Sequence, residues 1–141
     1  MKRFDNRTVI ITGGARGMGA SHARGFLAEG ANVVIADVLE REGRTLAGEL
    51  GDHAIFSRLD VTSDTNWAAT VAAAEDAFGP VSVLANNAGI VRFGQLADTT
   101  SAIWRQVIEV NLTGAFLGIR ASVPSMPVPC RTPASDSNTA N

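Results

Sequence analysis

The chain has 141 residues, of which 45% are hydrophobic and 18% are charged, a balance typical of a globular protein rather than a disordered or fibrous one. Its formal net charge of −2, with no basic run, argues against binding to nucleic acid or to an anionic membrane. The single cysteine, Cys130, excludes an internal disulfide and a multi-thiolate metal site, and the lack of a secretory signal or a long apolar run predicts a cytoplasmic protein without a membrane span.

The first third of the chain alternates apolar strands with amphipathic helices. Residues 8–12 form a continuous β-branched run that ends at two glycines, which predicts a strand buried on both faces of a parallel sheet. A helix is expected over residues 17–29, because small and apolar residues recur there at helical spacing before a closing glycine. Residues 32–36 repeat the buried-strand pattern, and residues 39–50 predict a second covering helix.

Two further strands and two further helices are expected downstream. Residues 54–59 predict a third strand and residues 81–85 a fourth. One helix begins at Ser63–Asp64 and ends at Gly79–Pro80, and a longer helix ends near Pro124. The apolar stripe expected along the longer helix consists of Ile103, Val107, Val110, Leu117 and Ala121.

Strands that alternate with helices in this way imply right-handed βαβ crossovers. The prediction is therefore an α/β fold, with a doubly wound parallel sheet of about four strands and helices on both faces. Residues 127–141 break the pattern, because they are rich in Pro, Ser, Thr and Asn and have no apolar period. We expect one domain over residues 1–126, followed by an aberrant or disordered tail where a fifth strand should begin.

A glycine-rich segment, Thr12 to Gly19, joins the first predicted strand to the first predicted helix. Gly13 suits a tight turn, Gly17 lets the backbone approach a pyrophosphate, and Gly19 allows the helix to pack closely on the strand. The start of the helix offers free N–H groups and the positive end of a dipole to an anion. Glycines in loops often serve turns alone, but their place between a strand and a helix predicts a dinucleotide-binding loop.

Asp37 ends the second predicted strand, about 20 residues beyond the glycine loop, where a carboxylate can accept hydrogen bonds from the adenosine ribose. The same carboxylate would repel the 2′-phosphate of NADP. Alternatively, Asp37 could simply cap the next helix. Arg16 would favour NADP, because a guanidinium in the loop could pair with that phosphate. The carboxylate favours NAD over NADP as the cofactor.

The spacing G-x-x-x-G-x-G after Thr12 occurs together with three further motifs, in order Asp60–Val61, Asn86–Asn87–Ala88–Gly89, and Asn111 within Val110–Gly114. Together they resemble the classical short-chain dehydrogenase/reductase family, over a region from about Thr8 to about Met126. The run from Gly13 to His22 is most similar to bacterial hydroxysteroid dehydrogenases of the 3α,20β type. The resemblance implies an incomplete Rossmann-type NAD-binding domain and hydride transfer between nicotinamide and an alcohol or ketone.

The resemblance also implies a role for each motif. Asp60 would hydrogen-bond the adenine amino group and the Val61 backbone would contact the ring, while Asn86, Ala88 and Gly89 would support the sheet and line the ribose and nicotinamide side. A pair of asparagines can also simply satisfy its own turn. The expected cofactor-binding residues are Gly13, Arg16, Gly17, Met18, Gly19, Asp37, Asp60, Val61, Asn87, Ala88 and Gly89, and no metal site is expected.

Asn111 is the one catalytic position that the resemblance implies in this chain, in a supporting role: it would kink the long helix and orient the family's catalytic lysine through water. The family's serine and its Tyr-x-x-x-Lys pair should follow Asn111. The sequence has no tyrosine, however, and its only lysine is Lys2. We therefore expect a truncated N-terminal half that is inactive alone. The alternative is a non-catalytic module that binds NAD or a partner protein.

The expected ligands are NAD(H) and, in a complete relative, a small alcohol or ketone. Self-association is expected through the helix from Ile103 to Ala121, although the apolar stripe of this helix could instead only cover the sheet.

Overall fold

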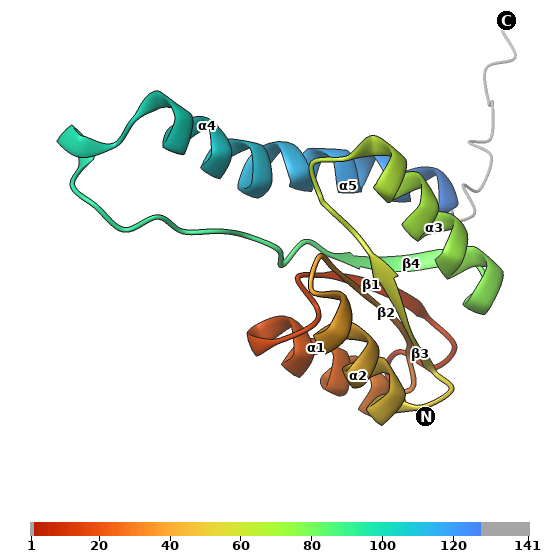
Figure 1. Cartoon of the computed structure of the whole chain (residues 1–141). Helices are drawn as coiled ribbons and strands as arrows, with labels where there is room; N and C mark the ends of the chain where they lie inside the picture. Colours follow the sequence, from red (N-terminus) through yellow and green to blue (C-terminus); the bar gives the residue numbers. More distant parts are fainter. Residues whose placement is uncertain (1, 128–141) are drawn as a thin grey trace, which may run out of the picture.

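The computed structural model describes residues 2–127, and within them four parallel strands form one sheet (Figure 1). The strands lie in the order β3-β2-β1-β4. Their bounds are Thr8–Thr12 (β1), Asn32–Asp37 (β2), Ala54–Arg58 (β3) and Val81–Ala85 (β4). The predicted parallel α/β sheet is confirmed, and each strand ends within one residue of the position expected from the sequence.

Helices cover both faces of this sheet (Figure 1). One face carries α1 (Gly17–Ala28) and α2 (Glu40–Leu50), and the other carries α3 (Asp64–Phe78) and α5 (Gly114–Ser122). Successive side chains of β1 point to opposite faces, so Val9 and Ile11 pack beneath α1 and α2 while Ile10 packs beneath α3 and α5. Because both faces are covered, the strand is apolar throughout rather than alternating.

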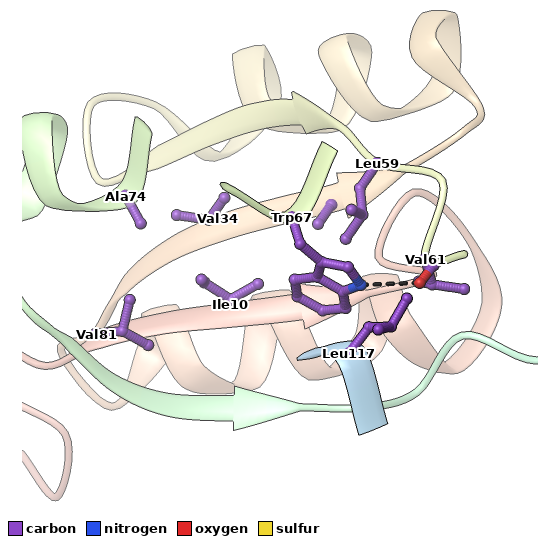
Figure 2. Packing of buried hydrophobic residues seen from close by; sticks show 9 residues of the cluster. Ile10, Val34, Leu59, Val61, Trp67, Ala74, Val81 and Leu117 are labelled. Atoms are coloured by element: carbon purple, nitrogen blue, oxygen red, sulfur yellow. Dashed lines mark hydrogen bonds between the residues drawn. The ribbon is translucent and has the colours of Figure 1, made fainter. Parts of the chain in front are cut away.

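The core beneath α3 is built around Trp67, which points toward Ile10 of β1 and Leu117 of α5 in Figure 2. Its indole N–H donates a hydrogen bond of 2.9 Å to the carbonyl oxygen of Val61. The helix itself starts where the sequence predicts, because the Ser63 side chain accepts a hydrogen bond from the backbone N–H of Asn66.

The long helix expected to end near Pro124 is divided into segments. A 3₁₀ turn that was not predicted, η1 (Leu96–Asp98), comes first and is followed by α4 (Ser101–Ile108), a π-helical turn, η2 (Glu109–Thr113), and α5. A second 3₁₀ turn, η3 (Val123–Ser125), contains Pro124 and ends the run. The π-helical turn shifts the phase of the side chains between α4 and α5.

This division makes part of the predicted apolar stripe wrong. Val110, Leu117 and Ala121 pack against the core, as expected, but Ile103 is exposed and α4 buries none of its residues. The physical reason is that α4 extends beyond the carboxyl ends of the strands, so no strand lies beneath it (Figure 1).

The predicted tail lies outside the described residues, apart from Pro127. Between residues 2 and 127 the longest helix, α3, has 15 residues, and no helix in that range combines the length and apolarity that a bilayer crossing requires.

Candidate functional site

The glycine loop forms the predicted turn between β1 and α1. Gly13 and Gly17 have φ angles of 62° and 55°, a left-handed conformation that side chains other than glycine rarely adopt. A Cβ on Gly19 would lie 2.0 Å from the carbonyl oxygen of Gly13, so only glycine fits where α1 meets the turn. At Gly17, in contrast, no atom of the described residues lies within 4 Å of the place a Cβ would occupy, apart from the adjoining residues and the nearby backbone of α1. The loop is therefore closed on its inner side and open beside Gly17.

Asp37, at the end of β2, lies against this loop and is only 8% exposed. One carboxylate oxygen accepts the backbone N–H of Ala15 at 3.0 Å, and the other accepts the N–H of Leu39 at 3.0 Å. The second contact lies just before α2 but does not cap the helix, because its N–H belongs to Leu39, which precedes the first turn, and no side chain of the described residues caps α2. The first contact joins the strand to the glycine loop. Each carboxylate oxygen retains acceptor capacity for a further donor.

Asp60 and Val61 lie in an irregular segment between β3 and α3. One Asp60 carboxylate oxygen accepts the backbone N–H of Thr62 at 2.9 Å and the Thr62 hydroxyl at 2.7 Å. These two hydrogen bonds hold the pKa of Asp60 below its usual range, and the one from the backbone has the larger effect. The positive charge of Arg58 lowers the pKa further by a smaller amount. Asp60 therefore faces the crevice described below as an ionised carboxylate at neutral pH.

The turn after β4 is fixed directly to the glycine loop. The Asn87 amide donates to the carbonyl oxygens of Thr12 and Gly13, at 2.9 and 3.2 Å. The Thr12 hydroxyl in turn accepts the N–H groups of Asn87 and Ala88, at 3.0 and 2.9 Å. The Asn86 amide reaches α5, where it donates to the Ala115 carbonyl at 3.3 Å. The asparagines thus join separate elements, which goes beyond satisfying their own turn.

Asn111 lies in the π-helical turn η2, at the point where the resemblance implied a kink. Its amide oxygen accepts the N–H of Ile90 at 2.8 Å, and its amide nitrogen donates to the Ile90 carbonyl at 2.9 Å. This two-point contact fixes the segment after β4 to the long helix.

These elements enclose a crevice of about 420 Å³ at the carboxyl ends of the strands. It opens above β1, where the strand order reverses between β2 on one side and β4 on the other, the place where open α/β sheets bind ligands. All eleven expected cofactor-binding residues line it, and Asn111 lies behind it through Ile90. Five lining residues were not predicted: Val38, Leu39, Leu59, Ile90 and Val110. All of them except Leu39, which lies two positions after Asp37, directly follow or precede a predicted position.

The family to which this fold and loop belong is settled by comparison with known proteins. A family model described as short chain dehydrogenase matches residues 7–132. The chain belongs to the short-chain dehydrogenase family. The resemblance inferred from the motifs is therefore confirmed.

Individual relatives agree with this assignment. This short-chain dehydrogenase is 49% identical over 124 residues to the 3-alpha-(or 20-beta)-hydroxysteroid dehydrogenase of Mycobacterium tuberculosis, covering 88% of the present chain and 48% of that protein. It is 38% identical over 128 residues to an NADP-dependent (R)-specific alcohol dehydrogenase of Lentilactobacillus kefiri, covering 88% and 50%. The chain therefore spans about half the length of the curated relatives it matches.

A solved structure shares the fold. The crystal structure of a short-chain dehydrogenase from Brucella melitensis, described as a glucose/ribitol dehydrogenase, superposes with a TM-score of 0.85 at 32% sequence identity. The match covers 89% of the present chain and 54% of the other.

Proposed function

We propose that this chain is the NAD(H)-binding part of an oxidoreductase that transfers hydride between nicotinamide and an alcohol or ketone. The observation that carries the proposal is the open space beside Gly17, at the start of α1, within a crevice lined by all the expected cofactor-binding residues. Membership of a dehydrogenase family favours this function over that of a non-catalytic binding module.

The crevice offers each part of the dinucleotide a matching group. Backbone N–H groups at the start of α1, beside Gly17, suit the pyrophosphate because they are unpaired donors at the positive end of the helix. The Asp37 carboxylate suits the adenosine ribose hydroxyls, and Asp60 with Val61 suits adenine. Ala88 and Gly89 line the opposite end, for the ribose next to nicotinamide. The bound cofactor would supply or accept the hydride.

Asp37 is proposed to select NAD over NADP, and the Asp37→Asn variant tests this charge without removing the side chain. We expect NAD to bind about tenfold or more weakly in the variant, because a charge-assisted hydrogen bond is worth about 1.5–3 kcal/mol. NADP should bind more tightly than before, because its 2′-phosphate no longer meets a carboxylate. Calorimetric titration with both cofactors measures the two affinities.

Asp52→Asn is the matched control, since Asp52 is exposed in the turn before β3, at the amino ends of the strands and away from the crevice. It should leave both affinities unchanged. Failure of the unsubstituted chain to bind either cofactor would overturn the proposed function, and tighter binding of NADP than NAD by that chain would overturn the assignment to Asp37. Both cofactors are titrated because one relative of this chain is described as NADP-dependent.

A polypeptide of these 141 residues is expected to bind NAD without oxidising an alcohol. It contains no tyrosine, and its only lysine, Lys2, lies beside Gly30 at the amino ends of the strands, away from the crevice. Without a proton relay, binding the cofactor alone does not position the groups that the reaction needs. Spectrophotometric detection of NADH over long incubation tests this expectation, and alcohol turnover that disappears in Asn111→Ala would contradict it.

We also propose that the chain associates with itself through α5. This helix is apolar on both sides: Leu117 faces the core, while Leu112, Phe116, Ile119 and Val123 are 54–64% exposed and recur at helical spacing, from η2 through η3. A helix that is apolar all round is typical of burial on both sides. The exposed set differs from the stripe predicted from the sequence.

Phe116→Glu combined with Leu112→Glu should therefore abolish self-association, because it places two charges on the exposed apolar face that runs from η2 through η3. Sedimentation analysis at several protein concentrations measures the distribution of species. Ala69→Glu, on the exposed side of α3, is the control and should not alter that distribution. A single monomeric species for the unsubstituted chain at all concentrations would refute the proposal.

A further inference from the structure

We propose that Trp67 is a positioning residue for nucleotide binding, which rests on the function proposed above. Trp67 does not itself line the crevice. It acts through Val61, which does, and so sets the affinity for adenine from within the core.

The Asp60–Val61 segment is attached to α3. This segment belongs to no helix or strand, so its position depends on contacts with its surroundings. The backbone N–H of Asp60 donates to the Asn66 side-chain oxygen at 3.1 Å. The Val61 carbonyl accepts the indole N–H of Trp67 at 2.9 Å (Figure 2). Two neighbouring residues in the first turns of α3 thus hold both residues of the segment.

Trp67 is held tightly in the core. Its side chain is buried, with 1% of its surface exposed. On the side of α5, a Cβ on Gly118 would lie 2.6 Å from the indole ring atoms, so the ring fills the space left by that glycine. A rigid donor of this kind restricts the position of the Val61 carbonyl more than a flexible surface side chain would.

Helix α5 confines Val61 from another side. A Cβ on Gly114 would lie 2.7 Å from Cγ2 and 3.0 Å from Cβ of Val61. Gly114 and Gly118 are four residues apart and lie on the same face of α5. Val61 is therefore held between the indole N–H of Trp67 and the backbone of α5, and its place in the crevice wall follows from both.

Trp67→Phe tests the inference, because phenylalanine keeps an aromatic ring but leaves the Val61 carbonyl without its donor. The measured quantity is the ratio of affinities for ADP and for inosine diphosphate, which differ at the amino group proposed to face Asp60. We expect the ratio to fall about three- to tenfold, as expected for one hydrogen bond. A change in stability alone does not alter this ratio at temperatures well below unfolding.

Gly114→Ala is the second variant and acts on Val61 from the other side. Alanine favours the helix, but its methyl group must displace Val61, so the ratio should fall again. Gly48→Ala, in α2, is its control, because no atom of the described chain lies within 4 Å of the added Cβ. Thr70→Val, in α3, is the control for Trp67: it removes the hydroxyl contact between Thr70 and Ser57 of β3 and should lower stability without changing the ratio.

The possible results distinguish failure of the positioning role of Trp67 from failure of the proposed function. If the unsubstituted chain binds ADP more tightly than inosine diphosphate and Trp67→Phe keeps that ratio, the positioning role is overturned while the proposed function stands. If Trp67→Phe does not fold, Gly114→Ala decides by the same criterion. If the unsubstituted chain binds no ADP at all, the proposed function fails, and the inference fails with it.

Discussion

Gly19→Ala is expected to destabilise the fold by about 3 kcal/mol or more, because the added methyl group has no room. Its Cβ would lie 2.0 Å from the carbonyl oxygen and 2.7 Å from the carbonyl carbon of Gly13. Both are backbone atoms of the turn between β1 and α1, so relief requires α1 to move away from the sheet. Urea unfolding followed by circular dichroism measures the loss.

Gly17→Ala is the informative comparison within the same loop. Its methyl group meets open space, so the only cost to the fold is the left-handed backbone at φ 55°, about 1–2 kcal/mol. The chain should therefore remain folded while NAD binding is lost, because the methyl group occupies the place proposed for the pyrophosphate. Equal stability of Gly19→Ala and the unsubstituted chain, or unchanged NAD affinity in Gly17→Ala, would contradict these expectations.

Thr12→Val is expected to cost about 2–4 kcal/mol and to weaken NAD binding. The Thr12 hydroxyl is the shared acceptor for the N–H groups of Asn87 and Ala88, in a side chain that is 1% exposed. Valine keeps the shape but leaves both donors without this partner. Since Ala88 and Gly89 line the crevice, relaxation of the turn should reach the binding site. Chemical unfolding and calorimetric titration measure the two effects.

Thr8→Val is the matched control in the same strand. Thr8 is also 1% exposed, but its hydroxyl makes a single hydrogen bond, to the Phe78 carbonyl at 3.2 Å at the other end of the sheet. The loss should be about 1 kcal/mol, with no change in NAD affinity. If both variants lose the same stability and the same affinity, the link between β1 and the turn after β4 has no special role in the site.

The site depends on contacts that cross the sheet. The glycine loop is fixed to β2 by Asp37, to the turn after β4 by Asn87, and that turn is fixed to the long helix by Asn111. Each of these polar side chains donates to or accepts from backbone groups, which fixes the loops relative to one another. A binding crevice assembled this way is largely formed before any ligand arrives.

The local elements were predictable from the sequence because their causes lie within a few residues. A run such as Thr8–Thr12 is apolar on both faces only if both faces are buried, and this determines a central parallel strand. The glycines of the loop indicate a backbone conformation or close approach that other residues cannot adopt, and Ser63 marks the start of α3. These signals placed the strands within one residue and identified the glycine loop and Asp37 as site candidates, whereas Asp60, Val61 and the turn after β4 were implied by the family resemblance. All eleven candidates line one crevice.

The tertiary structure alone decided which distant groups meet. Thr12 and Asn87 are 75 positions apart, and their hydrogen bonds depend on how β1 and β4 align in the sheet. The position of Val61 between Trp67 and Gly114 depends on how closely α5 approaches α3. Likewise, Leu117 and Ile103 were expected on one apolar stripe, but Leu117 is buried and Ile103 is exposed. The sheet lies beneath α5 and does not reach α4 (Figure 1). Periodicity reports that a face is apolar, but what covers it is determined by packing over the whole domain.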